Sequence, residues 1–328
     1  MKFASLALLS SAVFAMAPSA FAAPDVVVSI KPIHSLVASI MKGVGEPQLI
    51  VDGAASPHTF TMKPSNAKAL EKADLVFWVG HGMEAFLEKP LSALASDAKV
   101  VTLEDVPGLV KLPFREGGAF EAHDHGEHEH GEEHAHGHDK AEGGQHADHD
   151  DHDHEGFDTH LWLDPMNAKA MAVEIERVLV QADPANAAAY QANGAALIRQ
   201  VDALDAEITA TLAPVKDKPF VVFHDAYQYF EHRYDVAIAG SITVSPETMP
   251  GAERIGQIHK KVTSLGATCV FAEPQFEPKL VAVVTEGTKA RSGTLDPEAA
   301  TFKAGPDLYF ELMRGLASSM KQCLSQGM

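Results

Sequence analysis

The sequence is poor in cysteine, in positive charge and in long apolar runs. Its two cysteines cannot build a disulfide-dense scaffold, and they lie too far apart for a CxxC zinc knuckle. Lys and Arg number 26 against 45 Asp and Glu, so no basic stripe is available for nucleic acid. No window after the N-terminus approaches the roughly 20 apolar residues of a membrane helix. We therefore expect neither nucleic-acid binding nor membrane insertion.

The N-terminus has the pattern of a secretory signal peptide. Lys2 precedes an apolar stretch over 3–17, and residues 18–22 end in a small-x-small cleavage pattern at Ala22. The apolar stretch is too short for a membrane anchor, and no lipobox cysteine lies near its end. We therefore predict a signal peptide over residues 1–22, a mature chain that starts near Ala23, and a freely diffusing periplasmic protein.

The predicted export places the two cysteines in an oxidising compartment. There we expect Cys269 and Cys323 to form a disulfide that closes a loop of about 55 residues and stabilises the fold by about 2 to 4 kcal/mol. It would attach the C-terminal helix to the second half of the chain. A pair of thiolate metal ligands is the competing interpretation.

The apolar content, 46%, is high enough for a large core divided between two lobes. Apolar runs alternate with helical periodicity, which favours two α/β lobes with mostly parallel sheets joined by one long rigid helix. In the first lobe, residues 23–182, we predict strands at 25–30, 48–51, 74–79 and 99–103 and helices at 34–41, 65–72, 83–96 and 166–181. The linking helix over 183–213 would be about 45 Å long. In the second lobe, residues 214–328, we predict strands at 219–223, 236–241, 269–272 and 292–295 and helices at 226–233, 251–265, 280–288 and 307–325.

Residues 116–156 interrupt the first lobe with an insertion rich in Gly, Asp, Glu and His. From Glu116 to Asp158 the chain carries 15 acidic residues against Lys140 alone, and it cannot bury enough apolar surface to order itself. Eleven of the 18 histidines lie there: His123, His125, His128, His130, His134, His136, His138, His146, His149, His152 and His154. We predict several weak zinc sites that collect or sense zinc and empty as the pH falls below about 6.5. An acidic solubilising loop is the plainer alternative.

Four polar residues follow predicted strands or the insertion, where α/β folds place their ligands. They are His58, His160, His224 and Asp296. Imidazole suits zinc and similar divalent ions, and three histidines with a carboxylate or water would make a near-tetrahedral site. Position alone does not justify the grouping, because a lone histidine after a strand more often caps a helix or faces solvent.

Other histidines and one glutamate are weaker candidates. His81 also follows a predicted strand and could bind a second ion. His34 is expected to start a helix, and His232 and His259 to lie on helix surfaces. Glu273, directly after a predicted strand, could hydrogen-bond a metal-binding histidine or make a purely structural bond.

Four short motifs in a fixed order carry a family resemblance. They are Ser56-Pro57-His58, His160-Leu161-Trp162-Leu163-Asp164-Pro165, Phe223-His224-Asp225-Ala226-Tyr227 and Gly293-Thr294-Leu295-Asp296-Pro297. With them, essentially the whole mature chain resembles the metal-binding proteins of zinc and manganese ABC importers, the cluster A-I substrate-binding family. A histidine-rich acidic insertion between the first two motifs makes it look most like the zinc-binding members.

The resemblance implies a buried metal site between two lobes. His58, His160 and His224 match the three histidines of the family, and Asp296 matches a position that supplies a carboxylate in manganese-type and some zinc-type relatives. Zinc proteins of the family often carry Glu before the first histidine, where this chain has Pro57. The fourth ligand is therefore Asp296 or water, and we favour Asp296. Three histidines favour zinc, although copper and nickel also bind imidazole.

The function that the resemblance implies is capture of Zn²⁺ and its delivery to an ABC importer permease, which works with a cytoplasmic ATPase. We expect a monomer that is not an enzyme. A metal buffer or an adhesin without transport is an alternative that the sequence leaves open. Three histidines with an open position could also activate water, but no HExxH-type helix is present, which disfavours a zinc hydrolase.

Overall fold

The computed structural model describes residues 23–115, 120, 156–243, 250–266, 269–276 and 278–326. The predicted signal peptide, residues 1–22, and all eleven histidines of the insertion lie outside the described residues. Within the described ranges, no helix combines the length and the apolar character needed to cross a membrane.

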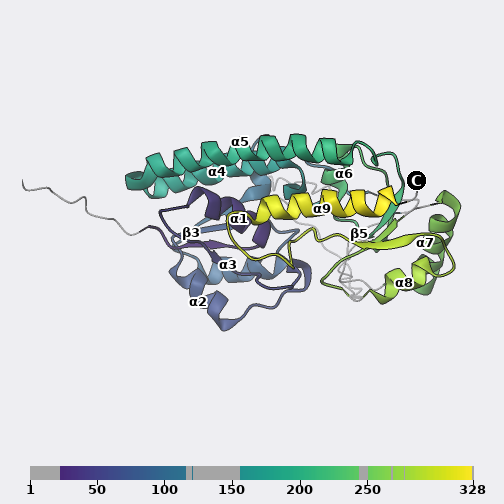
Figure 1. The fold of residues 1–328 in the computed structure, drawn as a ribbon. Coiled ribbons are helices and arrows are strands. Elements are labelled where there is room, and N and C mark those ends of the chain that lie inside the picture. Colours follow the sequence, from purple (N-terminus) through teal and green to yellow (C-terminus); the bar gives the residue numbers. More distant parts are fainter. Residues whose placement is uncertain are drawn as a thin grey trace, which may run out of the picture.

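Two four-stranded parallel sheets flanked by helices form two lobes (Figure 1). The first sheet has the order β2-β1-β3-β4, from β1 (Val26–Val28), β2 (Gln48–Leu49), β3 (Leu75–Trp78) and β4 (Lys99–Thr102). The second has the order β6-β5-β7-β8, from β5 (Phe220–His224), β6 (Ile238–Thr243), β7 (Cys269–Ala272) and β8 (Arg291–Thr294). The predicted α/β fold is confirmed, and both sheets follow one topology.

The helices lie close to their predicted positions. They are α1 (Lys31–Ile40), α2 (Pro64–Lys72), α3 (Glu88–Leu94), α4 (Pro165–Ala182), α5 (Ala187–Leu212), α6 (Gln228–Tyr234), α7 (Ala252–Leu265), α8 (Lys279–Thr285) and α9 (Leu308–Ser325). Asp164 caps α4, because its carboxylate accepts the N–H of Met166 at 2.8 Å. The helix predicted over 83–96 is instead a 3-10 turn, Ala85–Leu87, followed by α3. Pro90 has no N–H to continue an α-helix back through that turn.

The long helix α5 has 26 residues, about 39 Å, and runs along both lobes (Figure 1). It packs against α1, α4 and α9. It starts later than predicted because Pro184–Asn186 forms a separate 3-10 turn. The carboxylate of Asp183 holds that turn by accepting from Asn186 Nδ2 at 2.7 Å and Tyr190 OH at 2.9 Å. The exact lobe boundaries at 182/183 and 213/214 stay predictions.

One hydrophobic core runs through both lobes and the helices between them. It includes Val27 of β1, Phe77 of β3, Leu204 of α5 and Tyr309 of α9. A second, smaller cluster covers the other face of the second sheet and consists of Val221, Phe223, Ile242, Ile258, Val262, Val270, Val281 and Val284. The disulfide Cys269–Cys323 joins β7 to α9, as predicted.

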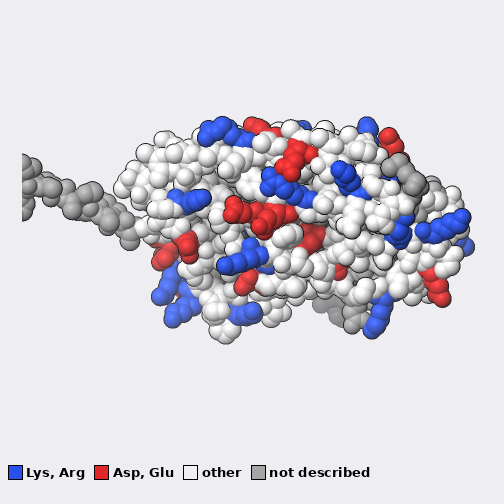
Figure 2. Space-filling view, viewed as in Figure 1, with Lys and Arg blue, Asp and Glu red and all other residues white. Residues whose placement is uncertain are grey.

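Charged side chains of both signs are interspersed over the face that Figure 2 shows, and its described part has no continuous basic area. Three surface ion pairs tie other helices to α5: Lys169–Asp202 from α4, Arg233–Asp205 from α6 and Arg314–Glu207 from α9. Exposed pairs of this kind each contribute little, so packing rather than charge fixes α5.

Candidate metal centre

Three histidines from separate parts of the chain meet in the structure. His58 lies in a 3-10 turn, Pro57–Thr59, His160 directly precedes the 3-10 turn Leu161–Leu163, and His224 is the last residue of β5. The Nε2 atom of His160 is 3.4 Å from the Nε2 atoms of both His58 and His224. We call this group the histidine triad. Among the described residues, it is the group of His, Cys, Asp or Glu with spacing suited to a metal ion.

The spacing of the histidine triad fits a tetrahedral zinc ion. At a Zn–N distance of about 2.0–2.1 Å, such an ion separates two nitrogen ligands by about 3.3–3.4 Å. Two edges of the triad already have this length, 3.4 Å. The three nitrogens therefore span two edges of a coordination tetrahedron, and all three lie within 4.8 Å of one another.

His160 is oriented by an aspartate two residues earlier. Oδ1 of Asp158 accepts from the backbone N–H of His160 at 3.0 Å and lies 2.7 Å from its Nδ1. With Nδ1 donating to this carboxylate, the lone pair of Nε2 faces the other histidines. This role was not predicted from the sequence, because Asp158 was counted with the acidic stretch that precedes His160; its place in Asp-Thr-His is a usable signal.

His224 is oriented by the glutamate that sequence analysis singled out. Glu273 directly follows β7, the strand beside β5, and its Oε1 lies 2.7 Å from Nδ1 of His224. Tyr227 OH donates to the same oxygen at 3.2 Å. In His160 and His224, a carboxylate therefore lies beside Nδ1, and Nε2 is the nitrogen that an ion could reach.

His58 is positioned by its own turn. Oγ of Ser56 accepts the backbone N–H of His58 at 3.3 Å, and Pro57 sets the backbone at the start of the turn. The side chains of His58, His160 and His224 are 12%, 7% and 2% exposed, so the histidine triad is nearly closed off from solvent.

The two acidic residues after β8 differ in what they contact. Asp296, predicted as the fourth ligand, faces its own turn: its oxygens accept from Ala300 N at 2.8 Å, Thr301 N at 2.9 Å and Thr301 Oγ1 at 2.8 Å. Glu298 faces the triad, with Oε1 3.7 Å from His58 Nε2. Glu298 was not predicted from the sequence, where its only signal is that it stands two residues after Asp296.

The two sides of the site hold protons differently. Burial, followed by repulsion from neighbouring imidazoles, lowers the pKa of His58 and His160 well below 6.5, so both are neutral at pH 7. Burial also pulls the pKa of His224 down, but the charge and hydrogen bond of Glu273 outweigh it and raise it to about 8. Burial raises the pKa of Glu298 to about 8. The second lobe therefore carries the protons that a cation would displace.

The weaker candidates lie away from the histidine triad. His81 is exposed, with Nδ1 3.6 Å from Oε1 of Glu88. His34 is buried inside α1 rather than at its start, and its Nε2 lies 3.0 Å from the carbonyl oxygen of Pro47. His232 and His259 belong to α6 and α7, as predicted.

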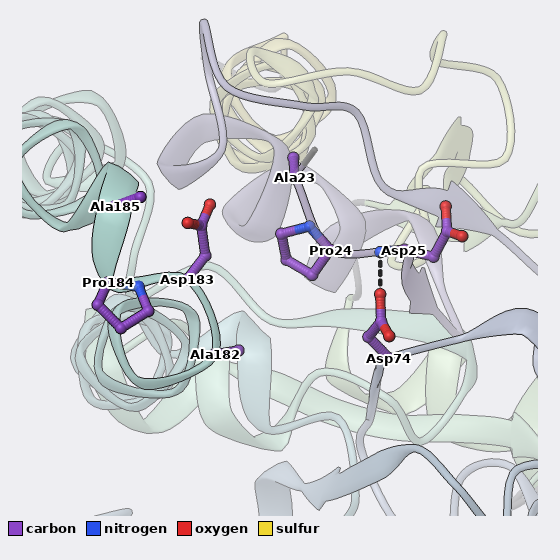
Figure 3. A pocket seen from close by; sticks show the side chains of 8 residues that line it. All are labelled: Ala23, Pro24, Asp25, Asp74, Ala182, Asp183, Pro184 and Ala185. Carbon is purple, nitrogen blue, oxygen red and sulfur yellow. Dashed lines mark hydrogen bonds between the residues drawn. The ribbon is translucent and has the colours of Figure 1, made fainter. Parts of the chain in front are cut away.

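A hollow of about 610 Å³ lies elsewhere, where the described chain begins (Figure 3). It is lined by Ala23, Pro24, Asp25, Asp74, Ala182, Asp183, Pro184 and Ala185. The Asp74 carboxylate accepts the backbone N–H of Asp25 at 2.7 Å, and Asp183 holds the turn before α5. No histidine lines this hollow, so it is separate from the metal centre.

The chain matches a known protein family over most of its length. The family described as zinc-uptake complex component A, periplasmic, matches residues 26–323. The chain belongs to this family. The high-affinity zinc uptake system proteins ZnuA of Brucella suis and Yersinia pestis are similar to it. The first is 56% identical over 306 residues, 92% of each chain, and the second 37% over 329 residues, 98% of each.

Solved structures show the same fold. A crystal structure of ZnuA has a TM-score of 0.72 at 24% identity and covers 92% of this chain and 99% of its own. The periplasmic zinc binding protein TroA from Treponema pallidum has a TM-score of 0.74 at 20% identity, with the same coverage of 92% and 99%. The resemblance inferred from the four motifs is confirmed at the level of the family, while the ligand role of each residue stays a prediction.

Proposed function

We propose that this protein captures Zn²⁺ in the periplasm with its histidine triad and delivers it to an ABC importer permease. The observation that carries the proposal is the pair of 3.4 Å Nε2 separations that bring His58, His160 and His224 together from both lobes. Membership of a periplasmic zinc-uptake family supports it. Members of this family bind and carry their ion and are not enzymes.

The imidazoles of the histidine triad are already oriented for a cation. Two of its imidazoles are neutral at pH 7, and His160 and His224 are held by Asp158 and Glu273. Such carboxylate partners fix the ring orientation and make the imidazole a stronger ligand. Binding would therefore require little rearrangement of the rings, which favours high affinity.

Location and partners follow from the family. Its members work with a membrane permease and a cytoplasmic ATPase, and the relatives named above are zinc uptake proteins. We propose that a signal peptide over residues 1–22 exports this chain and that it carries zinc as a monomer.

We also propose that the insertion binds further zinc ions more weakly. Its two ends meet close to the triad: Phe114 N donates to Gly156 O at 3.4 Å, and Asp158 N donates to Leu112 O at 3.0 Å. Asp158 also holds His160. Ions gathered by the eleven loop histidines would thus be released within a few residues of the triad, which supports a collecting role.

Zinc affinity of single variants tests the main proposal. His58→Ala, His160→Ala and His224→Ala should each lose about a quarter to a third of a binding free energy of about 10–16 kcal/mol, that is, about 2.5–5.3 kcal/mol, or about 70- to 8000-fold in affinity. His81→Ala and His232→Ala are matched controls and should bind as the parent does. Affinity is measured by competition with a tight chelator, which strips weakly held ions. Tight binding that survives His224→Ala would overturn the proposal.

Removal of residues 116–155 tests the role of the insertion. Because Arg115 and Gly156 flank ends that already pair, a short turn can close the gap. The shortened protein should keep one tight ion and lose the weaker ones, as counted by calorimetric titration. An unchanged number of ions with unchanged affinities would contradict the collecting role.

A further inference from the structure

We propose that Glu298 supplies the fourth ligand, an oxygen of its carboxylate, to the ion held by the histidine triad. The inference rests on the proposed function and adds to it a residue outside the four that the sequence singled out. It replaces both Asp296 and water at the fourth position.

Glu298 is a buried carboxylate that faces the triad. Its side chain is 6% exposed, and Oε1 lies 3.7 Å from Nε2 of His58. The other oxygen, Oε2, is 3.5 Å from Nε2 of Gln275, which can donate to it. One oxygen is thus turned toward an amide donor and the other toward the triad. A buried carboxylate requires a compensating positive charge, which a divalent ion among the imidazoles would provide.

The distance between Glu298 and His58 fits a ligand that moves slightly when the ion binds. A tetrahedral zinc ion with one oxygen and three nitrogen ligands separates neighbouring ligand atoms by about 3.3 Å. The separation between Glu298 Oε1 and His58 Nε2, 3.7 Å, exceeds this by a few tenths of an ångström. A small rotation of one side chain would close that difference, without movement of the backbone.

Asp296 is occupied by other bonds. A carboxylate offers about four acceptor sites. Three are taken by Ala300 N, Thr301 N and Thr301 Oγ1, and Gln275 Nε2 lies 3.4 Å from Oδ1. To bind the ion, Asp296 would have to abandon two backbone N–H groups in the interior, each at a cost of about 1–3 kcal/mol. Asp296 therefore positions the turn that presents Glu298.

The turn that carries Glu298 is held from both lobes. Its next residue, Ala299, has φ +57°, a left-handed conformation that costs a residue with a Cβ about 1–2 kcal/mol. Lys31 of the first lobe offsets this cost, because its buried ammonium donates to the carbonyl oxygens of Ala299, Ala300 and Phe302 at 3.1, 3.0 and 3.0 Å. A strained conformation secured by so many bonds is typical of a functional turn.

The test compares Glu298→Gln with Asp296→Asn in the full-length protein. Two readouts are used: zinc affinity against a tight chelator, and the visible spectrum of the Co²⁺ form, which responds to the ligands and geometry of the ion. Glu286→Gln, an exposed glutamate of the same lobe, controls for the loss of one charge. Thermal unfolding of the metal-free proteins shows whether each variant is folded.

We expect Glu298→Gln to lower zinc affinity by at least about 10- to 100-fold and to change the Co²⁺ spectrum. Asp296→Asn should keep the parent spectrum. If Glu298→Gln destabilises the fold, Glu298→Asp provides the same test, because it retains a carboxylate one methylene further from the ion and should bind with intermediate affinity.

Two results would overturn the inference. Parent-like affinity and spectrum in Glu298→Gln would assign the fourth position to water, and a changed spectrum in Asp296→Asn alone would assign it to Asp296. In both cases the three histidine variants would still lose the ion, so the proposed function would stand. Failure of the proposed function is distinguished by tight binding that survives replacement of the histidines themselves.

Discussion

The two lobes share one strand order but use the ends of their strands for different purposes. In each lobe a buried glutamate beyond the third strand of the sheet contacts a side chain at the end of the second: Glu84 with Ser29, and Glu273 with His224. Glu84 also accepts the backbone N–H groups of Val79 and Gly80 and so holds a turn. The same place in the scaffold therefore supports either a turn or a histidine of the triad, according to the residue opposite the glutamate.

The lobes also differ in how their hydrophobic cores are arranged. The core of the first lobe is continuous with α5 and α9, and it extends to one face of the second sheet. The other face of the second sheet has its own smaller cluster. The residues of β5 divide between the two: Val222 belongs to the shared core, whereas Val221 and Phe223 belong to the separate cluster. The part of the second lobe that surrounds the separate cluster should therefore unfold locally without unfolding of the first lobe.

We expect the largest effects from truncation of side chains in the shared core and in the separate cluster. Leu204→Ala, in the shared core, and Ile258→Ala, in the separate cluster, each remove a fully buried side chain at a cost of about 2–5 kcal/mol. Hydrogen exchange should rise in both lobes for Leu204→Ala and only around β6, α7 and α8 for Ile258→Ala. Exchange that rises in the same amides for both variants would show that the lobes share one cooperative unit.

Loss of the disulfide should affect the second lobe. Replacement of Cys269 and Cys323 by Ser releases a link between residues 54 apart in sequence, which we expect to lower the free energy of unfolding by about 2–4 kcal/mol. Denaturant titration measures the change, with the unreduced parent as control. An unchanged midpoint, or exchange that increases in β1 and β3 rather than β7 and α9, would contradict this.

Glu84 should make the stability of the metal-free protein depend on pH. Burial raises its pKa from 4.5 to about 7, so between these values the folded protein binds a proton that the unfolded chain releases. Stability should therefore fall as the pH rises from about 4.5 to 7 and then level off, by up to about 3 kcal/mol. The difference in unfolding free energy between the parent and Glu84→Gln, which does not titrate, isolates this effect. A difference that stays constant from pH 5 to 8 would contradict it.

Glu273→Gln should lower the affinity for zinc. Because Glu273 holds Nδ1 of His224, we expect zinc affinity to fall by about 10- to 100-fold, or about 1.4–2.7 kcal/mol. Glu84→Gln, the corresponding change in the first lobe, should leave zinc affinity at the parent value. Equal effects of the two changes would mean that Glu273 acts through general stability.

Most of the fold could be predicted from sequence because strands and helices leave periodic patterns. The misses are local: Pro90 shortens α3 at its start, and Pro184–Asn186 forms a 3-10 turn ahead of α5. Such turns depend on one proline and its side-chain bonds, which periodicity does not report.

Some side chains of the candidate site could be predicted from the sequence, and others could not. The histidines stand in recognisable motifs, and Glu273 directly follows a strand. The direction of the Glu298 side chain could not be predicted from the sequence, because it depends on the left-handed Ala299 and on Lys31, which is more than 260 residues away in sequence. Asp296 stood in a motif, but only the folded turn shows that its oxygens are occupied.

Zinc binding by the histidine triad can be located by anomalous diffraction at the zinc absorption edge from crystals of the zinc-loaded protein. We expect one strong peak about 2.0–2.1 Å from the Nε2 atoms of His58, His160 and His224. A peak elsewhere in the described fold, or none among these three nitrogens, would contradict it.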